Sequence, residues 1–96
     1  MIVHIVMFKF KEENKKENLL VAKNKLESLL SQVPTLNFME VGINFADEAR
    51  AFDMSLYSKF NTKEDLKAYA IHPEHLKVVE FIKSVALESK VVDYEL

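Results

Sequence analysis

The first ten residues constrain the fold of this chain more than any other segment. Residues Ile2–Phe10 are mostly β-branched or aromatic, a composition typical of a buried strand. Successive side chains of a strand point to opposite faces of the sheet. One face carries Val3, Ile5 and Met7, and the other carries His4, Val6, Phe8 and Phe10. Since only His4 interrupts these apolar sets, a sheet built around this strand must be covered on both faces.

The rest of the chain alternates between helical and strand periodicity. The predicted elements are a helix from about Leu19 to Val33, strands at 36–45 and 52–58, helical stretches at 63–70 and from Pro73, and a last strand at 91–96. Pro34 ends the first helix, because the residue before a proline avoids the helical conformation. Pro73 suits the first position of a helix. A change in apolar parity near Met39 indicates a β-bulge there.

The order β-α-β-β-α-β predicts one α+β domain over residues 1–96. It is the ferredoxin-like arrangement, a four-stranded antiparallel sheet with its helices on one face. No element is left to cover the other face, and an exposed apolar face of that size usually marks an interface. We therefore expect a homodimer in which two sheets meet face to face. We place His4, with Phe8 and Phe10, on the face inside this dimer.

Composition excludes several classes of protein. The chain has no cysteine, which excludes disulfide scaffolds and thiolate zinc sites, and Gly42 is its one glycine, which excludes Gly-rich phosphate loops. A net charge of −2 gives no field that would attract nucleic acid or anionic lipid. The first apolar segment is much shorter than the roughly 20 residues of a membrane helix. We expect a cytoplasmic protein without nucleic-acid or membrane partners.

Three histidines are the candidate site residues. His72 and His75 lie within the segment Tyr69–His75, and His75 begins the apolar row of the last helix. A neutral imidazole in such a place can act as a general base near pH 7. The alternative is a core histidine that makes a single hydrogen bond. A metal site formed with His4 is a weaker alternative, because His72 and His75 would diverge on either side of Pro73.

Three segments of the chain carry a resemblance to a known family. They are His-Ile-Val-Met-Phe-Lys-Phe-Lys at 4–11, Tyr-Ala-Ile-His-Pro-Glu-His at 69–75 and, closing the pattern, Val-Asp-Tyr at 92–94. Together they resemble the stress-responsive dimeric α/β barrel (Dabb) family. The resemblance covers essentially the whole chain. It implies a dimer whose two sheets close into a barrel, with a pocket beside the barrel for a small organic molecule. Many members of this family have no established activity.

The polyketide cyclases of this family supply the alternative function, a lyase that needs neither metal nor cofactor. The resemblance implies that His75 is the general base and that Asp93 orients it. The resemblance also implies that Tyr69 and His4 belong to this site and assist His75. At Leu26 these cyclases have a further pocket tyrosine, so the same substrate is not expected here. The histidines would otherwise be structural, with His75 and Asp93 joining the helix to the last strand.

Overall fold

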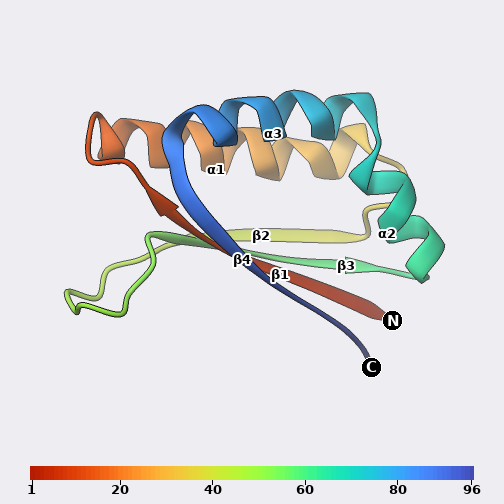
Figure 1. Ribbon diagram of the computed structural model, residues 1–96. Helices are drawn as coiled ribbons and strands as arrows, with labels where there is room; N and C mark the ends of the chain where they lie inside the picture. Colours follow the sequence, from red (N-terminus) through yellow and green to blue (C-terminus); the bar gives the residue numbers. More distant parts are fainter.

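The computed structural model describes residues 1–96 as seven elements (Figure 1). In chain order they are β1 (Ile2–Phe10), α1 (Lys15–Gln32), β2 (Phe38–Ile43), β3 (Met54–Phe60), α2 (Lys63–Ala70), α3 (Pro73–Val85) and β4 (Ala86–Glu95). The predicted ferredoxin-like order is confirmed, with the second helical region divided into α2 and α3.

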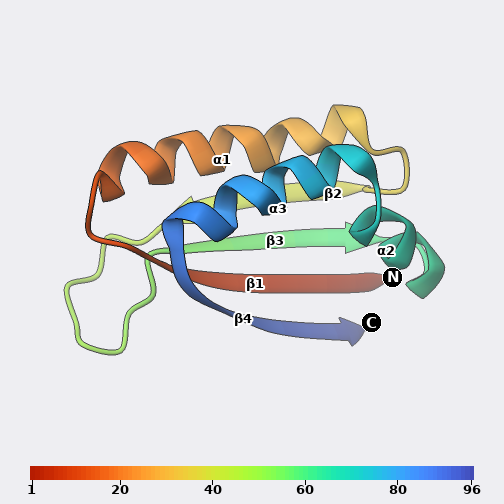
Figure 2. The same cartoon turned by 45° about the horizontal axis from the view of Figure 1, so that its top comes forward.

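The four strands form one antiparallel sheet in the order β2-β3-β1-β4. Figure 2 shows α1 and α3 side by side over one face of this sheet, with the short α2 at one end. The central strands, β1 and β3, lie beneath the helices. β4 is an edge strand, and its side chains are exposed along nearly its whole length.

A side-chain cap begins each of the helices α2 and α3. The Thr62 hydroxyl accepts a hydrogen bond from the Asp65 N–H at 3.0 Å at the start of α2. The His72 Nδ1 accepts one from the Glu74 N–H at 3.1 Å, and Pro73 follows as the first residue of α3. His72 is therefore a helix cap.

No helix of the chain has both the length and the apolar character needed to cross a membrane.

The hydrophobic core lies between the sheet and the helices, and it corrects our assignment of the faces of β1. Phe8 and Phe10 are buried in this core beneath the helices, and His4 shares their face. They do not lie on the face left open for a partner. Both faces of β1 are apolar, so alternation alone could not decide between them, and the larger aromatic side chains fill the space below α1 and α3.

The opposite face of the sheet has no helix over it (Figure 1). Pairing across the strands places on this face Val3, Ile5 and Met7 from β1, Tyr57 from β3, and Val92 and Tyr94 from β4. The exposed fraction is 43% for Met7 and 59% for Val92. The chain thus presents an open and partly apolar sheet face.

Two further strand predictions were wrong. β2 has no bulge near Met39, because its register with β3 is continuous from Phe38 to Ile43. The register shift of the sheet lies instead between Lys9 and Phe10, where β1 meets β4. β4 also begins earlier than residue 91, directly after α3, so the predicted short strand is ten residues long.

Candidate functional site

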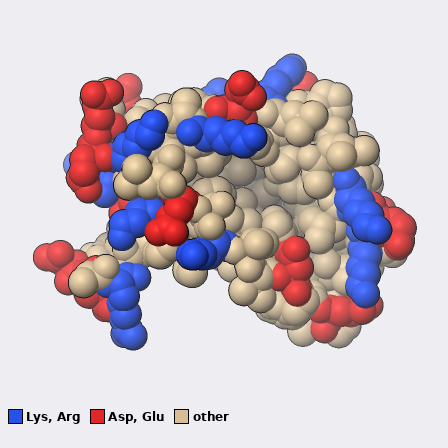
Figure 3. All heavy atoms as spheres, viewed as in Figure 1, with Lys and Arg blue, Asp and Glu red and all other residues tan.

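A cavity of about 230 Å³ lies between the helices and the sheet, next to β4. It is lined by His4, Val6, Phe8, Leu26, Leu56, Tyr69, His75, Val78, Val79, Ile82, Lys83 and Ser89. Figure 3 shows a hollow on this side of the molecule, with uncharged residues at its floor and charged side chains around it. Apolar walls with a few polar groups are characteristic of small-molecule sites.

His75 lies in the first turn of α3 and presents its ring to the cavity. Its Nδ1 is 3.0 Å from the carbonyl oxygen of Ala70, at the end of α2. Because a carbonyl can only accept, Nδ1 carries the hydrogen and leaves Nε2 unprotonated in the neutral ring. Burial lowers the pKa of His75. The ring is therefore neutral at pH 7 and able to accept a proton.

Tyr69 is the most deeply buried polar side chain at the cavity. It is only 1% exposed, and its hydroxyl has no hydrogen-bond partner. Its ring packs against the rings of Phe60 at 5.1 Å and His75 at 4.2 Å between centroids. Burial raises the pKa of Tyr69, so the hydroxyl stays protonated and can donate. An unpaired buried hydroxyl costs about 1–3 kcal/mol, which a partner inside the cavity would relieve.

The Nδ1 of His4 donates a hydrogen bond to the carboxylate of Asp93, and the two residues lie directly opposite each other on β1 and β4. The expectation that Asp93 orients His75 was wrong. The register of β4 places Asp93 against His4, whereas the carbonyl of Ala70 holds the ring of His75. The His4 ring lies 6.5 Å from the ring of Tyr69. Three of the four predicted site residues, His4, Tyr69 and His75, thus line the cavity, whereas Asp93 contacts His4 and lies outside the lining.

The three histidines do not converge on one point. The Nδ1 of His72 caps α3 and belongs to the helix start, whereas His4 and His75 line the cavity. No group of three or more His, Cys, Asp or Glu side chains is arranged to hold a metal ion.

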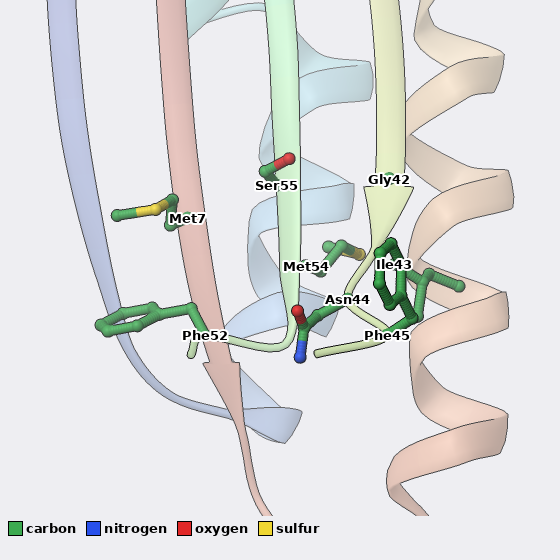
Figure 4. A pocket seen from close by; sticks show the side chains of 8 residues that line it. All are labelled: Met7, Gly42, Ile43, Asn44, Phe45, Phe52, Met54 and Ser55. Atoms are coloured by element: carbon green, nitrogen blue, oxygen red, sulfur yellow. The ribbon is translucent and has the colours of Figure 1, made fainter. Parts of the chain in front are cut away.

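A second hollow of about 330 Å³ lies at the open face of the sheet. Figure 4 shows that its side chains come from β1, from the ends of β2 and β3, and from the loop that joins β2 to β3. They are Met7, Gly42, Ile43, Asn44, Phe45, Phe52, Met54 and Ser55. No buried polar atom without a partner lies in this set. It is thus a weaker candidate for a small-molecule site than the cavity beneath the helices.

Sequence reasoning missed two polar residues of the cavity, Lys83 and Ser89. The apolar row that starts at His75 already points to Val79 and Ile82 on the lining face. Lys83 directly follows Ile82, and in the sequence it cannot be distinguished from an ordinary exposed lysine. Ser89 could be placed only from the register that sets it opposite Phe8.

These features define a ferredoxin-like α+β domain with an open sheet face and a small, mostly apolar cavity under its helices. The sequence profile of the Stress responsive A/B Barrel Domain family, Dabb, matches residues 2–96. The chain belongs to this family.

Several known proteins are similar to it. Two stress-response A/B barrel domain-containing proteins of Arabidopsis thaliana are 34% and 32% identical, over 82% and 97% of this chain. The chain spans only 30% and 46% of the lengths of these two relatives. A dimeric protein of unknown function and ferredoxin-like fold from Bacteroides fragilis is 30% identical, with a TM-score of 0.81. That match covers 99% of this chain and 95% of the other.

Proposed function

We propose that this protein is a homodimer that binds a small organic molecule in the cavity lined by His4, Tyr69 and His75. The unpartnered hydroxyl of Tyr69 carries the proposal. A buried donor without a partner is costly, and here it lies at the wall of a cavity large enough to hold a ligand. A ligand oxygen at this point would satisfy the donor, while the apolar walls contact the body of the ligand.

The dimer rests on the open face of the sheet. Met7 and Val92 leave apolar surface in solvent there, and the face has no covering element. The similar protein from Bacteroides fragilis is described as dimeric. A second copy of this chain would cover the face and leave the cavity on the other side of the sheet free for its ligand.

Phenol is a suitable first probe, because it pairs a hydroxyl with a benzene ring. A cavity of about 150 Å³ can hold benzene, and this cavity measures about 230 Å³. In an NMR titration with phenol, we expect saturable shifts of the His4 and His75 ring signals. His72, which caps α3 and does not line the cavity, serves as the internal control and should shift less than His4 and His75. Absence of any saturable shift with phenol and a panel of similar small aromatic compounds would overturn the proposal.

A second candidate function is cofactor-independent proton abstraction, as in a lyase, with His75 as the base. The contact between the His75 Nδ1 and the Ala70 carbonyl favours it, because it leaves Nε2 as a free proton acceptor. Acetophenone in D₂O tests this candidate directly, since its methyl protons lie next to a carbonyl. The protein should accelerate the exchange of these protons, and His75→Gln should abolish the acceleration. An equal exchange rate in both proteins would exclude His75 as a base for this chemistry.

A further inference from the structure

The rim of the cavity carries a cation without a carboxylate partner. Lys83 on α3 and Ser89 on β4 are exposed residues of the lining. Lys83 takes part in none of the salt bridges of the chain. Glu88, which shares a neighbouring hollow with Lys83, pairs with Lys90 at 3.7 Å. The ammonium group of Lys83 is therefore available to an anion at the rim.

About two turns of α3 separate Lys83, at the rim of the cavity, from His75, at its inner end. His75 and Lys83 are eight residues apart, which corresponds to about 12 Å along a helix. Between them the same helix contributes Val78, Val79 and Ile82 to the lining. The cavity thus has a hydrogen-bonding inner end, an apolar middle and a cationic rim.

We propose that the ligand is an organic acid whose carboxylate binds Lys83 at the rim, with its apolar body between α3 and the sheet. The proposal rests on the proposed function and names the ligand class for the same cavity. The Ser89 hydroxyl would donate a second hydrogen bond to the carboxylate, and Tyr69 would contact a polar group at the inner end. The volume suits an aromatic ring with a short acidic chain, since it exceeds what benzene alone requires.

Three probes that share a phenol ring and differ only in the head group test this proposal: 3-(4-hydroxyphenyl)propionate, 3-(4-hydroxyphenyl)propan-1-ol and 3-(4-hydroxyphenyl)propylamine. We expect NMR titration of the whole protein to show the tightest binding for the carboxylate and the weakest for the ammonium compound. Carboxylate binding should weaken as salt is added, because the ion pair lies at the surface. Lys83→Gln should weaken it by about twofold to fivefold, the modest effect of an exposed ion pair, and leave the alcohol unchanged.

Lys77→Gln is the matched control, because Lys77 is exposed on the same helix and lies outside the cavity lining. It should change the binding of none of the three probes. Equal affinity for the acid and the alcohol, with no effect of Lys83→Gln, would overturn the role of Lys83 and leave the proposed function standing. An equal loss in Lys77→Gln would also overturn it, since it would show a nonspecific charge effect. Failure of all three probes to bind would count against the proposed function itself.

Discussion

The rings of Tyr69 and His75 lie 4.2 Å apart, between centroids, across the break between α2 and α3. The break itself holds this pair in place, because the carbonyl of Ala70, the last residue of α2, contacts the Nδ1 of His75. Two short helices thus present a protonated hydroxyl and a neutral imidazole to one cavity. Side-chain caps at Thr62 and His72 begin these two helices.

Tyr69→Phe should weaken ligand binding without lowering the stability of the protein. Removing an unpartnered buried hydroxyl leaves the free energy of unfolding unchanged or raises it by up to about 1 kcal/mol. Affinity for phenol should fall, because the donor at the inner end is lost. Chemical denaturation and NMR titration check the two effects, with Tyr57→Phe on the open face as the control. A large loss of stability would show that the hydroxyl already has a partner within the protein.

The lowered pKa of His75 predicts a dependence of stability on acid. An unfolded histidine takes up a proton near pH 6.5, whereas the buried ring resists it. The unfolded state therefore binds more protons, and the free energy of unfolding should decrease as the pH falls below about 6.5. In His75→Gln this decrease should be smaller. Denaturant titrations between pH 7.5 and 5 measure it, and an unchanged slope would contradict the burial of a neutral His75.

Asp93→Asn should act on His4 and not on His75. The pair is only partly buried, with exposed side-chain fractions of 17% for His4 and 46% for Asp93, so we expect a loss of stability below about 1 kcal/mol. The ring signals of His4 should shift, because its Nδ1 loses a charged acceptor. Those of His75 should stay in place. A shift confined to His75 would instead support the pairing of Asp93 with His75 that the family resemblance implied.

Met7→Asp should convert the dimer to a monomer. It places a charge on the open sheet face, where burial against a second copy would be costly. Light scattering at micromolar concentration measures the mass. Leu20→Asp is the control, because Leu20 is 53% exposed and lies on α1, away from the open face. A wild-type monomer, or a dimer that survives Met7→Asp, would contradict the proposed interface.

The sequence was sufficient to predict the order of the elements, because most have a clear period, Pro34 follows the end of α1 and Pro73 begins α3. It could not decide which face of β1 meets the helices, since both are apolar. The contact of Asp93 depends on the register between β4 and β1, which no local pattern encodes. His75 was placed correctly on the inner face of α3 by helical spacing. Lys83 was missed because an exposed lysine at the end of a helix has no distinguishing signal.

The most direct test of the central claim is the position of bound phenol within the protein. Isotope-filtered NOE spectra with labelled protein report which side chains lie close to the phenol ring. We predict contacts with the methyl groups of Leu26, Val78 and Ile82, which line the cavity beneath the helices. Contacts only with Met7 and Ile43 would place phenol in the hollow on the open sheet face (Figure 4) and contradict the account.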